Sequence, residues 1–462
     1  MSKQIRKFDA VVLGSGQGGN PLARKLADIG EHVAMIESDH LGGTCINTGC
    51  TPTKTMVASA QIAHYARNAA RWGVRANDVG IDLPSIVRRK SEVVMRFRTG
   101  WEKSFDSNDH VTLYRKRGRF VGPKQIQVGD EVIEGHRIFI DTGSKPTIPA
   151  IEGLSSVPYL TNVSLLELED LPAHLLVLGG GYVGLEFGQI FRRFGSEVTV
   201  IQSAERILPN EDADITDELR RSLEAEGVKF ILAGRASKAR GQSRDIELTV
   251  DGAKGPQILR GSHLLVATGR TPQTQDLDLS KTGVETNARG FITVNERLET
   301  TAPDIWAIGD VTGGPAFTHI SYNDFQIIYG NLYEDKRLST ASRIVPYAVY
   351  TDPTLGRVGL TEKAARAQGR KLKIGRNPMT SVARAIERSE TAGTMKLVVD
   401  ADTDRVIGAS ILSTEGGELV QILSTLMLAD KPYTLLKGAI YIHPTLAEGF
   451  FGLMESVKAA DE

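Results

Sequence analysis

The sequence predicts an α/β protein that contains two doubly wound parallel units and a smaller α+β domain at the carboxyl end. Apolar, β-branched runs at 8–13 and 175–178 are each followed by a Gly-x-Gly-x-x-Gly turn, a helical stretch and a second apolar run. These glycine turns stop near residue 341, where strands and helices alternate in another pattern. A chain of 462 residues is long enough for about three domains.

The first unit carries every part of a dinucleotide-binding fingerprint. Gly14 allows a tight turn, Gly16 lets the backbone approach a pyrophosphate, and Gly19 lets the helix pack closely. The helix N-terminus attracts the pyrophosphate, and Glu37 is placed to accept the ribose hydroxyls. The expected elements are a buried strand at 8–13, a helix at 20–30 and a strand at 32–36.

The same pattern occurs a second time. The second turn holds Gly179, Gly181, Tyr182 and Gly184. It is expected between a strand at 175–178 and a helix that runs to about 194, followed by a strand at 197–201. Two Rossmann-like units in one chain predict two dinucleotide ligands.

The second copy differs where it would hold a ribose. Gln202 occupies the position of the usual acidic residue, and Arg206 is near enough to reach a 2′-phosphate. This predicts use of NADPH or NADH. The alternative is that Arg206 only pairs with a nearby acid.

Later glycine turns follow other strands. Gly143 lies in Ile-Asp-Thr-Gly-Ser, Gly269 lies in Val-Ala-Thr-Gly-Arg, and a proline follows each within a few residues. We interpret both as exits from the nucleotide-binding units. Asp310 follows Gly309 at the end of an expected strand within 301–312, where a carboxylate is well placed to bind a hydroxyl-bearing chain.

The chain has only two cysteines, Cys45 and Cys50, with four residues between them. On a regular helix their Cα atoms would be about 7.5 Å apart along the axis, beyond the roughly 4.4–6.8 Å of a disulfide. A bond therefore requires a distorted turn, to which Gly49 and Pro52 are suited. A strained, accessible disulfide is easily reduced. The alternative is two unrelated buried thiols; no zinc site is expected because no further ligands complete one.

Composition excludes several classes of protein. The net charge is −1, with 55 basic and 56 acidic residues and no long run of either sign, so no nucleic-acid or polybasic membrane partner is expected. The apolar segment 175–191 is interrupted by glycines and Glu186, which argues against a membrane span. With no signal region and only two cysteines, a cytoplasmic protein is expected, where a cysteine pair is more often catalytic than structural.

The carboxyl-terminal region is expected to form a separate α+β domain. In it, His443 precedes Pro444, which favours an extended or turn conformation, with a cis bond as one option. Glu448 lies about one helical turn further on, where a carboxylate can fix the imidazole tautomer. The alternative is an ordinary surface or core histidine. The expected strands are 345–350, 394–399 and 405–412, and the expected helices are 361–368, 415–430 and 445–457.

Together, and in this order, the motifs resemble those of the class I pyridine nucleotide–disulfide oxidoreductases over essentially the full length. These FAD flavoproteins include dihydrolipoamide dehydrogenase, glutathione reductase and mercuric reductase. Residues 42–54 match the redox-disulfide motif, Gly309-Asp310 the second FAD motif, and His443-Pro444-Thr445 with Glu448 the acid–base motif.

The resemblance implies a role for each site residue. Cys50 would face the flavin and Cys45 would attack the substrate. Lys54 would pair with Glu186 beside the flavin. In a homodimer, His443 and Glu448 would reach the cysteine pair of the other subunit. FAD would contact Gly14, Gly16, Gly19, Glu37, Thr44, Gly143 and Asp310, and NADH or NADPH would contact Gly179, Gly181, Tyr182, Gly184, Gln202, Arg206 and Gly269.

The resemblance also implies the domains and the reaction. An FAD-binding domain (1–150, with the redox disulfide) and its central part (276–340) would enclose an NAD(P)-binding domain (151–275), before a dimerisation domain (341–462). Electrons would pass from NAD(P)H through FAD and Cys45–Cys50 to a small oxidised-sulfur, disulfide or metal-ion substrate.

The branch of the family follows from one segment. Residues 317–325 are most similar to the mercuric-reductase-like and reactive-chlorine-resistance branch, although the vicinal carboxyl-terminal cysteines of classical mercuric reductases are absent. A dihydrolipoamide dehydrogenase is the alternative enzyme, and a redox-sensing flavoprotein with little turnover is the alternative of another class. Asp141 departs from the alanine usual at its turn.

Overall fold

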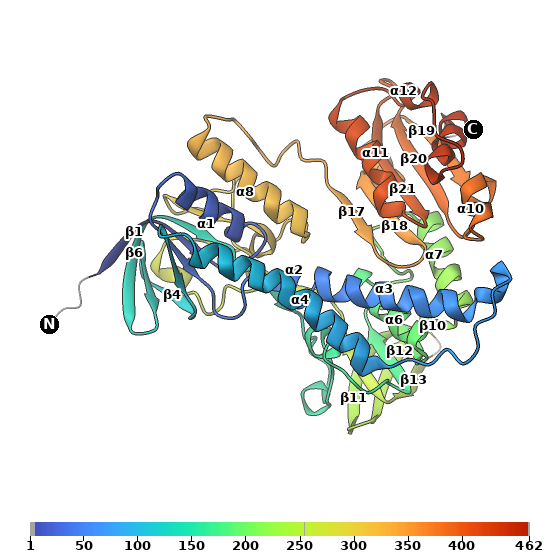
Figure 1. The fold of residues 1–462 in the computed structure, drawn as a ribbon, viewed down its shortest axis with the longest axis horizontal. Coiled ribbons are helices and arrows are strands. Elements are labelled where there is room, and N and C mark those ends of the chain that lie inside the picture. Colours follow the sequence, from blue (N-terminus) through green and yellow to red (C-terminus); the bar gives the residue numbers. More distant parts are fainter. Residues whose placement is uncertain (1–4, 254, 461–462) are drawn as a thin grey trace. The chain divides into compact units, whose positions relative to one another are not determined.

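The computed structural model describes residues 5–253 and 255–460, and the chain divides into two compact units. Each unit gathers segments that are distant in the sequence, which the chain colours of Figure 1 make visible. Unit 1 comprises residues 5–55, 85–147 and 269–343, and unit 2 comprises the other described residues. None of the helices in the described part of the chain combines the length and apolarity that a membrane crossing needs.

A seven-stranded sheet forms the centre of unit 1, in the order β3-β2-β1-β6-β5-β4, with β16 beside the carboxyl end of β6. The strands β1, β2, β3, β6 and β16 are parallel, β5 is antiparallel to β6, and β4 is antiparallel to β5. The strands are β1 (Arg6–Leu13), β2 (Val33–Ile36), β3 (Val111–Tyr114), β4 (Gly118–Gly122), β5 (Gln125–Val128), β6 (Glu131–Ile140) and β16 (Ile305–Ala307).

Both faces of this sheet are buried, as the apolar run at 8–13 predicts. Ala10 and Val12 pack in the same core as Leu22, whereas Val11 and Leu13 lie in a second core on the opposite face. The helices α1 and α8 lie side by side on the first face (Figure 1). The helices of unit 1 are α1 (Gly19–Asp28), α2 (Gly43–Asn47), α4 (Leu83–Asp106) and α8 (Thr318–Tyr333); α3 (Cys50–Arg67) begins in unit 1 and ends in unit 2.

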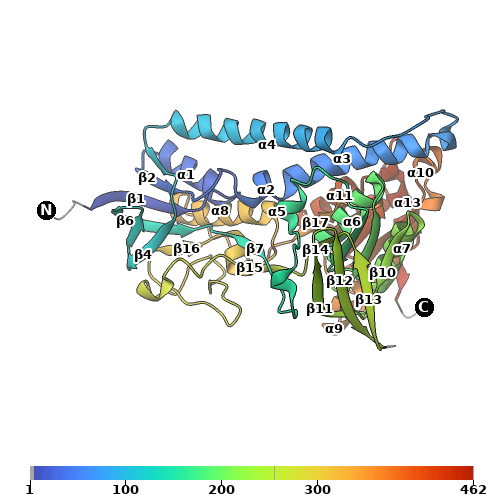
Figure 2. The ribbon, with the colours of Figure 1, turned by 90° about the horizontal axis from the view of Figure 1, so that it is seen from below.

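Unit 2 contains the second predicted nucleotide-binding fold. Its parallel sheet has the order β10-β9-β8-β14, and an antiparallel sheet of β11, β12 and β13 accompanies it (Figure 2). These elements are β8 (His174–Leu178), α6 (Tyr182–Phe194), β9 (Glu197–Ile201), α7 (Ala213–Ala225), β10 (Val228–Ile231), β11 (Arg235–Gln242), β12 (Asp245–Gly252), β13 (Gly255–Gly261) and β14 (His263–Val266).

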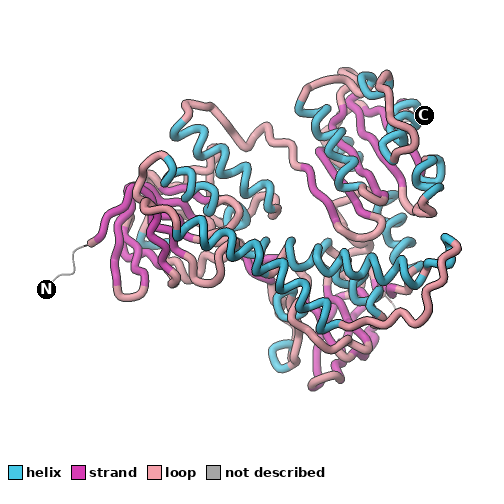
Figure 3. The backbone as a smooth tube through the Cα atoms, in the orientation of Figure 1, coloured by secondary structure: helices cyan, strands magenta, loops and turns pink. Residues whose placement is uncertain are grey.

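The carboxyl-terminal part of unit 2 is a six-stranded antiparallel sheet with helices on both faces, and Figure 3 shows its strands in magenta. Met395 and Leu397 pack with α11 and α13, whereas Val398 packs with Ala365 of α9. The elements are β17 (Pro346–Val349), β18 (Thr354–Gly359), α9 (Glu362–Ala367), β19 (Leu372–Pro378), α10 (Ala383–Glu387), β20 (Thr394–Asp400), β21 (Val406–Ser413), α11 (Gly416–Leu428), α12 (Thr434–Lys437), α13 (Gly449–Glu455) and β22 (Lys458–Ala459).

Two expected elements are shorter in the structure. The strand expected within 301–312 is β16 alone, because Gly309 adopts a φ of +68° and starts a 3₁₀ turn. The helix expected at 445–457 begins as a 3₁₀ turn, and α13 follows it. In this turn, Thr445 and Glu448 form a capping box.

Candidate active site

Four predicted features meet at one edge of the unit 1 sheet. The carboxyl ends of parallel strands share an edge, and the order reverses at β1, which has β2 on one side and β6 on the other. Ligands of open α/β sheets bind at such a reversal. The first glycine turn follows β1, Glu37 follows β2, Asp141 follows β6, and Gly309-Asp310 follows β16.

The first glycine turn is packed backbone against backbone. Gly14 has a φ of +100°, and a Cβ there would lie 2.2 Å from the carbonyl oxygen of Asp141. A Cβ on Gly19 would lie 2.4 Å from the carbonyl oxygen of Gly14. Glu37 accepts hydrogen bonds from the Ser15 N–H (3.0 Å) and hydroxyl (2.7 Å). The turn excludes side chains, as a loop that admits a pyrophosphate must, so these residues fit FAD.

The later glycine turns, at Gly143 and Gly269, lie next to the paired strands that contact Asp310. The short strands β7 (Ser144–Pro146) and β15 (Arg270–Pro272) pair antiparallel in unit 1. Gly143 and Gly269 have φ values of +67° and +127°, with no atom within 4 Å of a built Cβ. The Ser144 hydroxyl donates to Asp310 Oδ2 at 2.5 Å, and Arg270 Nε lies 3.6 Å from the same oxygen.

The second glycine turn repeats this packing in unit 2. A Cβ on Gly179 would lie 2.3 Å from the carbonyl oxygen of Ala267, and one on Gly184 would lie 2.0 Å from that of Gly179. The Gln202 amide oxygen accepts the Gly180 N–H at 3.2 Å, much as Glu37 accepts from the first turn. An uncharged side chain therefore occupies the position in the second turn at which the first turn has Glu37.

The rest of the nicotinamide candidates lie beside this turn. Gly181 caps α6, and Tyr182 is its first residue. Arg206 Nε lies 3.5 Å from Asp217 Oδ1, and both side chains are about half exposed. The structure thus contains the pairing that the sequence analysis gave as the alternative for Arg206. Its contact with a 2′-phosphate stays a prediction.

The two cysteines lie on either side of a break between helices. Cys45 belongs to α2, Cys50 is the first residue of α3, and two residues separate the helices. A Cβ on Gly49 would lie 2.7 Å from the Thr44 carbonyl oxygen, so the break requires glycine. Pro52 is in the first turn of α3, where a missing N–H costs nothing. The predicted distortion of this segment is confirmed.

The structure shows the cysteines as thiols in contact with each other. A hydrogen bond to Cys50, and then burial, raise the pKa of the Cys45 thiol. The Thr318 hydroxyl lies 3.2 Å from Cys50 Sγ. Thr318 is the first residue of α8, whose N-terminus favours negative charge. The Cys45 thiol therefore loses its proton less readily than an ordinary cysteine, although the Thr318 hydroxyl acts in the opposite direction.

Thr318 had no role in the sequence analysis, although it lies within the segment 317–325. The available signal was a hydroxyl residue at a helix start shortly after the second FAD motif. Thr44 is exposed on α2. Lys54 belongs to unit 1, and Glu186 is buried in unit 2, where it accepts the Tyr350 N–H at 2.8 Å. The pairing of Lys54 with Glu186 stays a prediction.

His443 and Glu448 form the predicted pair in unit 2. The imidazole Nδ1 lies 3.0 and 3.2 Å from the two Glu448 oxygens, and the peptide bond to Pro444 is cis. The Thr445 N–H, and then His443, lower the pKa of Glu448. Because a carboxylate only accepts, the proton of the neutral imidazole is on Nδ1, and Nε2 is the nitrogen with the lone pair in that form. The His443 side chain is 71% exposed, so this lone pair is available to another molecule.

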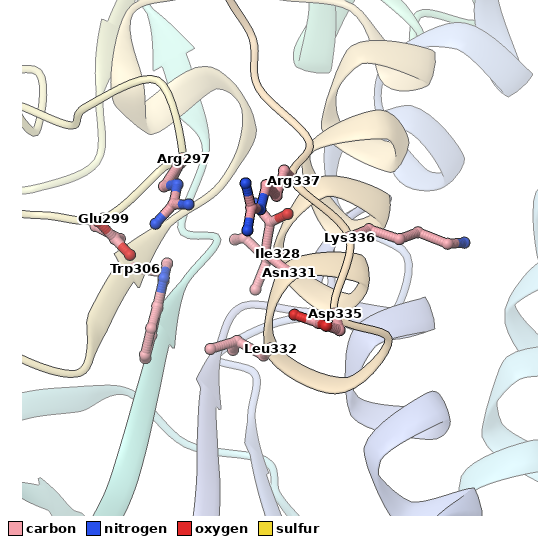
Figure 4. Close-up of a pocket in the computed structure, with 9 residues that line it drawn as sticks. All are labelled: Arg297, Glu299, Trp306, Ile328, Asn331, Leu332, Asp335, Lys336 and Arg337. Atoms are coloured by element: carbon pink, nitrogen blue, oxygen red, sulfur yellow. The ribbon is translucent and has the colours of Figure 1, made fainter.

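A cavity of about 270 Å³ in unit 1 is separate from these residues. Its lining includes Trp306 and the carboxyl-terminal end of α8, whereas Thr318 beside the thiols starts that helix. Figure 4 shows the guanidinium groups of Arg297 and Arg337 facing each other in this cavity. Within the described residues, no three His, Cys, Asp or Glu side chains come together as metal ligands.

Replacing Gly49 with alanine should disturb the redox pair. The new Cβ would clash with Thr44, so we expect the variant to unfold at lower denaturant, with a loss of about 1–3 kcal/mol, and to form the Cys45–Cys50 disulfide more slowly. Gly100→Ala is the control, because no atom lies near its Cβ. Chemical denaturation and thiol titration measure both effects. Equal behaviour of the two variants would contradict the steric role of Gly49.

Comparison with known proteins agrees with this geometry. Residues 8–324 match the pyridine nucleotide-disulphide oxidoreductase family, and residues 345–452 match its dimerisation domain. The chain is 36% identical to the probable pyridine nucleotide-disulfide oxidoreductase RclA of Escherichia coli K12, covering 98% of this chain and 100% of the relative. It is 33% identical to the mercuric reductase of Lysinibacillus sphaericus, covering 96% and 81%.

Two further likenesses matter. The dihydrolipoyl dehydrogenase of Thermus scotoductus is 35% identical, and the alignment covers 98% of each chain. The solved structure of the HOCl-induced flavoprotein disulfide reductase RclA from Escherichia coli matches with a TM-score of 0.89 at 36% identity, covering 97% of this chain and 100% of the other. The predicted family, fold class and branch are confirmed. The chain belongs to the pyridine nucleotide-disulphide oxidoreductases, and it is an FAD flavoprotein that uses NADH or NADPH.

Proposed function

We propose that the protein transfers electron pairs from NAD(P)H through Cys45 and Cys50 to a small oxidised-sulfur, disulfide or metal-ion substrate. The observation that carries the proposal is the contact between the Cys45 and Cys50 side chains, with the Thr318 hydroxyl 3.2 Å from Cys50 Sγ. When bound, FAD would accept a hydride from the nicotinamide and deliver two electrons to a disulfide. The residues of the chain hold, orient and protonate the sulfur atoms.

We assign different tasks to the two sulfurs. We place the negative charge of the reduced pair on Cys50, which is the more exposed sulfur and lies beside Thr318, and this suits the sulfur that receives electrons from the flavin side. Cys45 attacks one sulfur of a substrate disulfide, and the second substrate sulfur leaves with a proton. Cys50 then attacks the mixed disulfide, which releases the first substrate thiol and restores the Cys45–Cys50 bond.

Cys45 has to lose a proton before it attacks. Its pKa is raised by the hydrogen bond to Cys50 and by burial, so a base is required. The exposed Nε2 of His443 can accept this proton and return it to the leaving sulfur, while Glu448 holds Nδ1. We assign this base to the partner subunit of a homodimer.

A partner copy also explains the exposed apolar surface near His443. Ile440 and Ile442 are 100% and 79% exposed, and Leu435 and Phe451 are about half exposed. These residues lie in or near the part of the chain that matches the family's dimerisation domain. A second copy of the chain would bury them and bring its own thiol pair to His443.

A second candidate function is dihydrolipoyl dehydrogenase, because a relative of that name is as similar as the reductases. A steady-state panel separates the candidates. It tests NADH and NADPH with lipoamide, glutathione disulfide, hypothiocyanite, Hg(II) and Cu(II). Rapid NAD+-linked oxidation of dihydrolipoamide would favour the dehydrogenase, whereas turnover with the other acceptors alone supports our proposal. Failure of all of them would favour a redox sensor.

Single substitutions of the cysteines should give opposite results. Two-electron reduction of the protein should produce the long-wavelength absorption typical of a thiolate beside a flavin. We expect it to disappear in Cys50→Ser and to persist in Cys45→Ser, because Cys50 carries the charge. Absorption spectra during anaerobic titration measure this. The reverse pattern would exchange the roles of the sulfurs.

Thr318→Val should make this absorption appear only at higher pH. Loss of a hydrogen bond to a charged sulfur should shift its midpoint upward by roughly one pH unit. Thr318→Ser keeps the hydroxyl and is the matched control. If valine and serine behave alike, the hydroxyl does not stabilise the thiolate.

His443→Gln should slow exchange with a disulfide substrate about 10²–10⁴-fold, the usual contribution of a general acid–base. Flavin reduction by NAD(P)H should remain within about twofold, because no proton transfer by His443 is involved in that half-reaction. Stopped-flow measurement of each half-reaction tests this, with exposed His136→Gln as the control. Equal slowing of the two half-reactions would remove the proposed role.

A further inference from the structure

Asp141 places a buried carboxyl where the two FAD motifs meet. It follows β6, and its side chain is almost fully buried. Its Oδ2 accepts the N–H of Gly19 at 2.7 Å, at the start of α1. A Cβ on Gly16 would lie 2.6 Å from Oδ2, and one on Gly309 would lie 3.3 Å from Oδ1. The carboxyl thus contacts the glycine turn and the second motif together.

The surroundings of this carboxyl disfavour a negative charge. Burial raises the pKa of Asp141, and so do the charges of Asp310, Asp324 and Glu37. The hydrogen bond from the Gly19 N–H lowers the pKa of Asp141 in opposition to these effects. The cations nearby are engaged with other acids: Arg270 lies beside Asp310, and Arg343 pairs with Asp324.

The second nucleotide-binding unit provides an internal comparison. Ala267 occupies the position of Asp141, and its carbonyl oxygen meets Gly179 as that of Asp141 meets Gly14. The Asp141 N–H donates to the Leu13 carbonyl of β1 and the Ala267 N–H to the Leu178 carbonyl of β8, each at 2.8 Å. The equivalent turn of unit 2 therefore forms its backbone hydrogen bond without a carboxyl group. The Asp141 carboxyl is present only in the first turn, and the backbone conformation of such a turn does not require it.

The Asp141 carboxyl affects the binding of the ligand expected at the first glycine turn. A pyrophosphate brings negative charge to the N-terminus of α1, where the carboxyl already lies. An ionised Asp141 would repel it, whereas a neutral acid adds no charge and has an O–H to donate. Asp141 must therefore take up a proton when FAD binds, if it does not already hold one.

We propose that Asp141 is a positioning residue that links FAD binding to a proton, because it supports the glycine turn as a neutral acid and repels the cofactor when ionised. The proposal rests on FAD as the cofactor of unit 1. Linkage between FAD and the proton sets the direction of the pH dependence. The affinity for FAD is highest at pH values at which Asp141 is protonated in the free protein. It falls as the pH rises through the titration of that group, by up to about tenfold per pH unit for one proton.

FAD retention by the holoenzyme tests the linkage. Flavin fluorescence after dilution gives the dissociation constant between about pH 5 and pH 9. We expect the wild-type constant to rise with pH, while Asp141→Asn and Asp141→Ala vary by less than about twofold. Both variants should fold, since Ala267 shows that the turn tolerates alanine. Asp109→Asn removes an exposed acid of unit 1 and should retain the wild-type profile.

Infrared spectroscopy of ¹³C-aspartate-labelled holoenzyme tests the proton directly. A protonated carboxyl band should be present at neutral pH in the wild type and in Asp109→Asn, and should be lost in Asp141→Asn. Identical pH profiles for wild type and Asp141→Asn, with no band lost, would overturn the proposal. Colourless wild-type protein would instead refute the FAD assignment, so the two failures are distinguishable.

Discussion

Both nucleotide sites depend on one steric contact, in which a strand-end carbonyl lies against the first glycine after the neighbouring strand. Gly14 meets Asp141, and Gly179 meets Ala267, at distances that no side chain would permit. This contact joins β1 to β6 in the first parallel sheet and β8 to β14 in the second, at the carboxyl ends of these neighbouring strands. It leaves the helix N-terminus open toward the ligand, and the other site residues take their positions from the same sheet edge.

The contact between the two cysteines depends on a different feature, the break between helices α2 and α3. A continuous helix would separate the sulfurs, and the break at Gly49 brings them into contact. The start of α8 then places the Thr318 hydroxyl 3.2 Å from Cys50 Sγ, and Cys45 is the less exposed of the two sulfurs. The difference between two chemically identical thiols is therefore a property of their neighbours, and the proposed mechanism gives each sulfur a separate task.

The sequence was sufficient for those features that depend on local pattern. Apolar runs, glycine spacing and the Cys, His and Glu motifs predicted the duplicated fold and most candidate residues. The role of Thr318 could not be predicted, because its contact with Cys50 joins residues 268 positions apart. The sequence shows that Asp141 departs from the usual alanine, but it does not predict the contacts of the side chain, since only the fold places it against Gly16, Gly19 and Gly309. The strand at 301–312 was overestimated because one glycine conformation ends it.

Gln202 has a consequence for the supply of reducing equivalents. Its neutral amide supports the second glycine turn without the charge that would repel a phosphorylated ribose. If Gln202 faces the ribose as proposed, selection between the two dinucleotide coenzymes is left to weaker contacts. The flow of electrons into the protein would then follow whichever coenzyme pool is more reduced.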